Sequence, residues 1–178
     1  VLRTRVEAQV MAAARYDGAL QLAIKRLQFN DKPRIARPLG ELLREQVERE
    51  LDCDTYDCIV PVPLHRVRRR GRGFNQAELL AQEIVPLFVN ALIDTSLVRL
   101  RPTHVQSRLH SEKQRRDSVH GAFALGANAN FAGKRVLLID DVVTTGATIH
   151  ECATVLKKGG AAVVDVLAVA LAIPGPDA

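Results

Sequence analysis

The residues best suited to chemistry stand in one stretch, 140–148. Two adjacent carboxylates, Asp140 and Asp141, follow an apolar run, and a segment rich in threonine and glycine comes next. Carboxylates accept hydrogen bonds from a sugar diol or bind Mg²⁺ through oxygen, and the N–H groups at a helix start bind phosphate. We therefore expect a sugar-phosphate site, in which the carboxylates take two hydroxyls or Mg²⁺. Phosphate would lie against Thr144, Thr145, Gly146, Ala147 and Thr148.

The alternative interpretation of this stretch, without a ligand, is a surface turn with a good helix cap. Asp and Thr are common at strand-to-helix turns, and for any single residue the cap is the simpler interpretation. The whole nine-residue arrangement favours a ligand site, because in open parallel sheets ligands bind beyond the carboxyl ends of the strands.

Basic residues gather in two further stretches of the chain, whose net charge is +5. Five arginines lie within seven residues, from Arg66 to Arg72, and a second basic stretch covers 99–116. This surplus fits an anionic partner, either nucleic acid or a phosphorylated small molecule. With two Tyr, five Phe and no Trp, a single-strand binder built on stacked aromatic rings is disfavoured.

The elements that would position these residues follow from the apolar periodicity. The first 55 residues have leucines at helical spacing and are expected to be helical. Short apolar runs predict strands over 56–62, 135–140 and 162–170, and possible strands at 96–100 and 121–125. Helices are expected from Asn75, as N-cap, and over 148–158, with an arginine-rich loop before the first. The pattern predicts one α/β domain over 1–178, with a mostly parallel sheet covered by helices on both faces.

Several classes of protein are disfavoured. The longest apolar run, 161–173, is too short for a membrane span and contains Asp165. The first fifteen residues carry three arginines and do not resemble a signal peptide. The three cysteines form no C-x-x-C pair, which argues against a zinc site and for a reducing, cytoplasmic setting. No Ser-His-Asp arrangement is supported, and catalytic residues stay unassigned.

The stretch 140–148 closely resembles the phosphoribosyl pyrophosphate (PRPP) motif of the type I phosphoribosyltransferases. The chain is also similar to the ComF (GntX-like) family of competence-associated phosphoribosyltransferase-like proteins. The stretches that carry this second likeness are 16–29, 60–65, 72–77 and 114–123. Many members of that family begin with a four-cysteine zinc ribbon, so either this member lacks it or the printed sequence starts after it.

The resemblance implies roles for individual residues. Asp140 and Asp141 would hold the ribose hydroxyls and Mg²⁺, and 144–148 would hold the 5-phosphate. Ala147 replaces the commoner glycine, a change too small to prevent phosphate binding. Residues 101–120 would form a mobile hood or, alternatively, a disordered basic loop. The residues of the pyrophosphate loop would be Leu64, His65, Arg66, Arg72 and Gly73.

The implied reaction transfers ribose 5-phosphate from PRPP to an acceptor and releases pyrophosphate. The acceptor, which would lie under the hood, is not identified by any residue. Two further interpretations stay open. The domain would bind PRPP or a nucleotide as a regulator without turnover, or it would serve DNA uptake through its basic loops.

Overall fold

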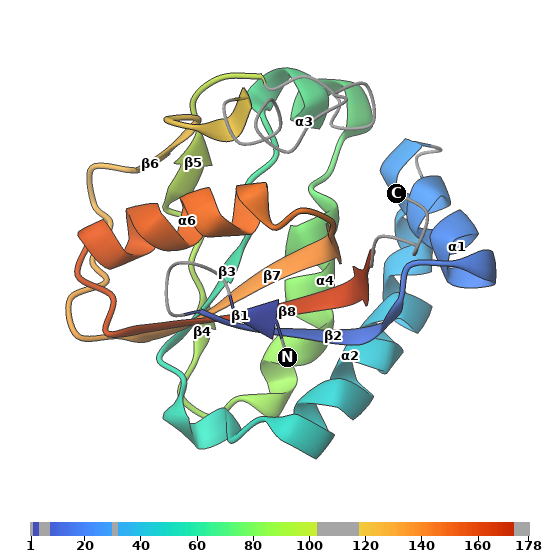
Figure 1. Ribbon diagram of the computed structural model, residues 1–178, viewed down its shortest axis with the longest axis horizontal. Coiled ribbons are helices and arrows are strands. Elements are labelled where there is room, and N and C mark those ends of the chain that lie inside the picture. Colours follow the sequence, from blue (N-terminus) through green and yellow to red (C-terminus); the bar gives the residue numbers. More distant parts are fainter. Residues whose placement is uncertain (1, 4–7, 30–31, 103–117, 173–178) are drawn as a thin grey trace.

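A six-stranded sheet forms the centre of the computed structural model, which describes residues 2–3, 8–29, 32–102 and 118–172 (Figure 1). The strand order is β1-β2-β8-β7-β3-β4. Strands β2, β8, β7, β3 and β4 run parallel, and the edge strand β1 is antiparallel to β2. The strands are β1 Leu2–Arg3, β2 Gln9–Arg15, β3 Cys58–Pro61, β4 Leu92–Ile93, β7 Arg135–Val143 and β8 Val163–Leu171.

Helices cover both faces of this sheet, as the sequence predicts. Figure 1 shows α6 on one side of the strands and α2 and α4 on the other. A separate two-stranded antiparallel sheet pairs β5 (Leu97–Arg99) with β6 (Phe123–Leu125). The α-helices are α1 Gly18–Phe29, α2 Ala36–Glu50, α3 Arg66–Arg72, α4 Gln76–Ile84 and α6 Ala147–Lys158. Short 3-10 turns lie at Pro33–Ile35, Cys53–Thr55 and Val85–Leu87.

The side chains on the two faces of β7 pack into two separate hydrophobic cores. Val136 and Leu138 pack with α6, whereas Leu137 and Ile139 pack with α1, α2 and α4. This division follows from the strand geometry, in which successive side chains point to opposite faces. A strand buried on both sides must be continuously apolar, which explains the run at 136–139.

The expectation that the first 55 residues are helical is wrong at the N-terminal end. Residues Gln9–Arg15 form β2, which pairs in parallel with β8. Its sequence includes three alanines, has a single β-branched residue, Val10, and lacks the alternation that signals a strand. Pairing with β8, for example Ala12 opposite Ala168, overrides the weak local preference. The helices expected after it are present as α1 and α2.

The arginine-rich segment is also corrected, because it is a short helix rather than a loop. His65 begins α3 as N-cap, with its Nδ1 accepting from Val67 N at 3.3 Å. Gly73 ends it in the left-handed conformation, with φ of 79°. Arginine has a high helix propensity, so a run of arginines between two caps favours a short helix over a loop. Asn75 caps α4 as predicted, and its side chain accepts from Ala77 N.

Two further points concern the expected boundaries. Strand β7 continues to Val143 rather than ending at Asp140, so Asp141 also lies within it. Most of the expected hood falls on 103–117, outside the described residues. None of the helices in the described part of the chain is long and apolar enough to cross a membrane.

Candidate functional site

The carboxylate pair lies at the carboxyl end of β7, in the centre of the parallel sheet. Asp140 and Asp141 are only 9% and 4% exposed. The neighbouring strand β8 runs parallel to β7 along this region. Two ionisable groups buried beside each other are costly unless a partner compensates them, so this pair has the character of a binding site.

Each carboxylate accepts a hydrogen bond from the backbone N–H of the residue that follows it. Asp140 Oδ1 accepts from Asp141 N at 2.9 Å, and Asp141 Oδ1 accepts from Val142 N at 2.9 Å. Asp141 has a second fixed contact, because its Oδ2 accepts from Gln28 Nε2 of α1 at 2.7 Å. Both Asp141 oxygens therefore have a hydrogen-bond donor that fixes the orientation of this carboxylate.

The two carboxylates serve different faces of the sheet. Asp140 follows the register of Leu138 and lies on the α6 side, where Arg99 and Cys152 are within electrostatic range. Asp141 follows the register of Ile139 on the other side, where Gln28 contacts it. On that side, burial and the charge of Asp141 together raise the pKa of Tyr16. The pair therefore links the two layers of helices at one point of the sheet.

The Asp140 carboxyl is electrostatically strained in its charged form. Burial raises its pKa well above the usual range, and the charge of Asp141 raises it further. Arg99 acts in the opposite direction. Hydroxyl donors or a divalent cation would relieve this strain, so the pair fits a ribose diol and a substrate-borne Mg²⁺. Among the described residues, no three His, Cys, Asp or Glu side chains gather into a group that could hold a metal ion by themselves.

The predicted phosphate segment forms the entry to α6. Gly146 is the N-cap residue, with φ of 73°, and an added Cβ there would meet nothing within 4 Å. A glycine has no side chain with which to occupy the first N–H groups of α6, so an anion can approach them. Thr144 and Thr145 are exposed beside it. Ala147 instead packs its methyl group into the core, which explains why alanine is tolerated where glycine is commoner.

Helix α3 presents its basic side chains in different settings. Arg66, Arg68 and Arg70 are exposed. Arg69 forms an ion pair with Glu78 at 3.1 Å. Arg72 donates to Gln76 Oε1 at 2.6 Å and stacks 5.9 Å from the Phe29 ring centroid. The assignment of a pyrophosphate contact to Leu64, His65, Arg66, Arg72 and Gly73 therefore stays a prediction, and Arg72 already has protein partners.

The proximity of two further residues to the carboxylates could not be predicted from the sequence. Gln28 lies 113 positions before Asp141 and is one of several polar residues on α1. Arg99 lies on β5, and its charge acts to lower the pKa of Asp140. Gln28 belongs to the stretch 16–29 that resembles the ComF family, and that likeness is the one signal that points to it. Nothing distinguishes Arg99 from other arginines along the chain.

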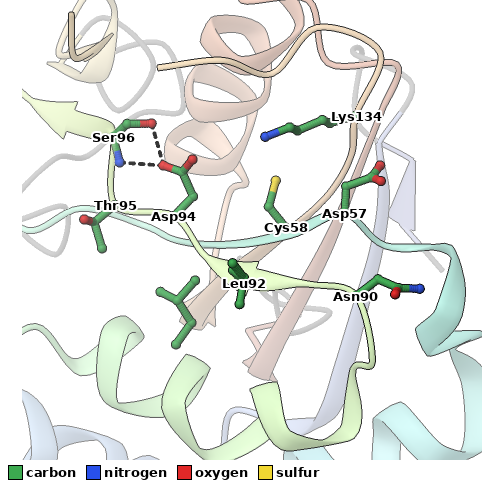
Figure 2. A pocket seen from close by; sticks show the side chains of 9 residues that line it. Asp57, Cys58, Asn90, Leu92, Asp94, Thr95, Ser96 and Lys134 are labelled. Carbon is green, nitrogen blue, oxygen red and sulfur yellow. Dashed lines mark hydrogen bonds between the residues drawn. The ribbon is translucent and has the colours of Figure 1, made fainter. Parts of the chain in front are cut away.

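A separate cavity of about 490 Å³ lies at the opposite ends of the strands (Figure 2). Its lining includes Asp57 and Lys134, which immediately precede β3 and β7. In Figure 2, Asp94 turns toward Ser96, and its Oδ1 accepts from Ser96 N at 2.7 Å. Because Asp140 lies at the carboxyl end of β7, this cavity is distinct from the carboxylate site.

The sequence of the chain is similar to that of known proteins. The model of the phosphoribosyl transferase domain family matches residues 66–174. Competence protein F of Haemophilus influenzae is 36% identical over 149 residues, which cover 82% of this chain and 65% of that protein. DNA utilization protein YhgH of Salmonella typhimurium is 34% identical over 161 residues, covering 89% of this chain and 70% of that protein.

A third relative and one solved structure match in different proportions. Competence protein ComFC of Bacillus subtilis is 35% identical over 116 residues, 61% of this chain and 42% of that protein. The glutamine PRPP amidotransferase of B. subtilis, solved with ADP and GMP, is 15% identical with a TM-score of 0.49. The aligned region covers 93% of this chain and 32% of the amidotransferase.

Proposed function

Because the chain belongs to the phosphoribosyl transferase domain family, among relatives of competence protein F and YhgH, we propose that it binds PRPP at the end of β7. We further propose that it transfers ribose 5-phosphate from PRPP to an acceptor. The relatives' names refer to competence and DNA utilization and name no acceptor.

The observation that carries the proposal is the buried carboxylate pair directly before a glycine-capped helix. Asp140 and Asp141 lie within β7, and Gly146 opens α6 only five residues after Asp141. A sugar phosphate has the same arrangement, with a diol of hydrogen-bond donors at one end and a dianion at the other. The carboxylates repel phosphate and accept hydrogen bonds from hydroxyls, whereas the N–H groups of α6 donate to phosphate. The site therefore favours one orientation of the sugar phosphate, with its diol at the carboxylates and its phosphate at α6.

The proposed reaction needs no covalent intermediate on the protein. The C1–pyrophosphate bond breaks through an oxocarbenium-like transition state, and the acceptor forms the new bond at C1. Asp140 and Asp141 would fix the ribose through its hydroxyls, and the α6 N-terminus would fix the 5-phosphate. Mg²⁺, carried on the substrate, would neutralise charge on the departing pyrophosphate. The protein then contributes position and electrostatic stabilisation.

Two other functions are supported by the same features. A regulator would bind PRPP at this site without turnover. A DNA-associated protein would instead use the exposed arginines of α3, and the relatives named DNA utilization protein favour that candidate. Both alternatives predict different measurements from those of a transferase.

A release assay separates the three functions. The protein is incubated with Mg²⁺-PRPP and a panel of nitrogenous bases and amines, and inorganic pyrophosphate is measured. A transferase releases pyrophosphate with at least one acceptor, and the Asp140→Asn variant releases less. PRPP binding without release under every acceptor favours the regulator. Absence of PRPP binding, with DNA affinity that falls steeply with salt, favours the DNA-associated function.

A further inference from the structure

The sheet is incompletely covered at its β4 edge, on the side of α6. Strand β4 is the last strand of the sheet, and its Leu92 lies in register with Cys58 of β3. Residues in register point to the same face, and Cys58 packs in the core that α6 covers. Leu92 is nevertheless 76% exposed. The α6 layer therefore ends before the edge strand, and the cavity of about 490 Å³ is lined by both residues.

Three charged side chains line this cavity, one ammonium and two carboxylates. Figure 2 shows the ends of Lys134 and Asp94 on opposite sides of the Cys58 thiol, with Asp57 on the side of Lys134. All three charges act on the pKa of Cys58, which agrees with this arrangement. Burial, more than these charges, raises the pKa of the thiol to about 11. Cys58 therefore forms part of the cavity wall and is not a nucleophile.

The opposite charges in the cavity do not pair with one another. Among the described residues, the Lys134 ammonium has no ion-pair or hydrogen-bond partner. Asp94 Oδ1 accepts from Ser96 N at 2.7 Å, and Asp57 Oδ2 accepts from Arg135 N at 2.7 Å. Each carboxylate is thus fixed through one oxygen, and its other oxygen has no partner in the described part of the chain. A ligand that carries both charges can therefore satisfy groups that are held apart.

We propose that this cavity binds a small α-amino acid, with a basic side chain favoured over an acidic one. The α-carboxylate of the ligand pairs with Lys134, its α-ammonium pairs with Asp94, and its aliphatic part lies against Leu92. Because the cavity has two carboxylates and one ammonium, Asp57 is left to attract a further positive charge. The cavity volume falls within the range of about 300–1,000 Å³ that is usual for small-molecule sites.

The ligand of this cavity is not the acceptor of the proposed transfer. The cavity lies at the starts of β3 and β7, whereas Asp140 lies at the carboxyl end of β7. The inference therefore does not rest on the proposed function.

Calorimetric titration with matched analogues tests the two halves of the site. L-Lysine is compared with cadaverine, which lacks the carboxylate, and with ε-aminocaproate, which lacks the α-ammonium. We expect wild-type protein to bind L-lysine and L-arginine, and to bind each analogue roughly 10- to 100-fold more weakly, because each analogue lacks one charge-assisted contact. L-Glutamate should bind more weakly than L-leucine, because its extra negative charge meets Asp57.

Two variants assign the contacts. Lys134→Met should bind L-lysine and cadaverine equally, and Asp94→Asn should bind L-lysine and ε-aminocaproate equally, because each variant lacks the group that distinguishes the two ligands. Asparagine keeps the oxygen that accepts from Ser96 N, so the turn stays fixed. Lys158→Met is the matched control, since Lys158 is an exposed lysine of α6 outside the cavity lining. This control should keep wild-type affinity for every ligand.

Three results would overturn the inference. The first is no heat of binding for any of these amino acids at tens of millimolar, from wild-type protein that melts cooperatively. The second is binding of L-lysine with unchanged discrimination between ligands in both variants, since the ligand then lies elsewhere. The third is competitive displacement of L-lysine by Mg²⁺-PRPP, which would place the amino acid at the end of β7.

PRPP binding is measured in the same variants to keep the two proposals apart. Lys134→Met and Asp94→Asn should bind Mg²⁺-PRPP within twofold of the wild type, since both residues lie at the other end of the strands. If wild-type protein binds no PRPP but binds L-lysine in the predicted manner, only the proposed function fails. If it binds PRPP and none of the amino acids, only this inference fails.

Discussion

Gln28 Nε2 donates to Asp141 Oδ2 at 2.7 Å, so the last turn of α1 fixes a carboxylate that lies 113 residues further along the chain. Asp141 Oδ1 is held in turn by Val142 N. Asp140 accepts from Asp141 N within the same strand, and the charge of Arg99 on β5 acts to lower its pKa. The adjacent aspartates therefore have different surroundings, and the side-chain donor to Asp141 comes from a helix.

The Gln28→Leu variant tests whether α1 positions the carboxylate. Loss of a hydrogen bond to a charged group costs on the order of 1.5–3 kcal/mol, so we expect PRPP affinity to fall about tenfold or more. Gln21→Leu, the same change two turns earlier in α1, is the control and should bind PRPP normally. Equal affinities for both variants in calorimetry would show that the Gln28 contact does not orient the site.

The Asp140→Asn variant should be more stable than the wild type at neutral pH and bind PRPP more weakly. Asp140 has a raised pKa in the fold, above the ordinary value of 3.8. At a pH between the pKa of Asp140 in the unfolded chain and its raised pKa in the folded protein, the native state binds more protons than the unfolded state. The stability that this group contributes therefore falls as pH rises. Asparagine does not titrate and so removes that loss. The free energy of unfolding of the variant, relative to that of the wild type, should therefore increase from pH 4 upward and then level off.

Thermal melts from about pH 4 to pH 8 check this behaviour, and a gain of about 1 kcal/mol would raise Tm by roughly 2–4 °C. The contrary result is an Asn variant that is less stable than the wild type at neutral pH. That outcome would mean that the Asp140 charge is already compensated in the free protein.

Gly146→Ala should weaken ribose 5-phosphate binding. The residue has φ of 73° at the entry to α6, and a side chain there is strained by roughly 1–2 kcal/mol. Gly133→Ala is a matched control, since Gly133 has φ of 71°, equal open space and a position before β7. We expect similar losses in Tm, with weaker ribose 5-phosphate binding only for Gly146→Ala. Equal phosphate affinities in the two variants would argue against a phosphate at the α6 N-terminus.

Tyr56→Phe should lower stability without affecting PRPP. The Tyr56 hydroxyl donates to the buried Asp165 Oδ2 at 2.9 Å, and Arg135 Nη2 donates to the same oxygen at 2.8 Å. Loss of one such bond costs about 1–2 kcal/mol, which denaturant unfolding can measure. This network lies near the starts of β7 and β8, away from Asp140. A parallel loss of PRPP affinity would show that the two ends of the sheet are coupled.

Most of the parallel sheet can be predicted from the sequence because its central strands are buried on both faces. The runs around 136–139 and 163–170 are short, apolar and rich in β-branched residues, which favours buried strands over helices. Strand β2 escapes prediction because alanine carries little strand preference, and only pairing with β8 determines its conformation. Helix α3 escapes it because neither apolar periodicity nor length marks a seven-residue helix.

The sequence places the carboxylate pair and the turn into α6 correctly because they are contiguous in the chain, whereas their roles toward a sugar phosphate stay predictions. Gln28, which donates to Asp141, and Arg99, whose charge acts on Asp140, could not be predicted, since each comes from a distant element and belongs to a common residue type. Contacts of this kind depend on how α1 and the β5–β6 pair pack around β7, which no local pattern encodes.

Titration of the protein with Mg²⁺-PRPP in a calorimeter decides whether the end of β7 is a PRPP site. We expect saturable binding of one PRPP per chain, displaced by ribose 5-phosphate and strongly weakened in the Asp140→Asn, Asp141→Asn double variant. Inorganic phosphate, which needs only the α6 N-terminus, should keep most of its affinity in that variant. If wild-type protein that melts cooperatively gives no heat of binding at millimolar PRPP, the end of β7 is not a PRPP site.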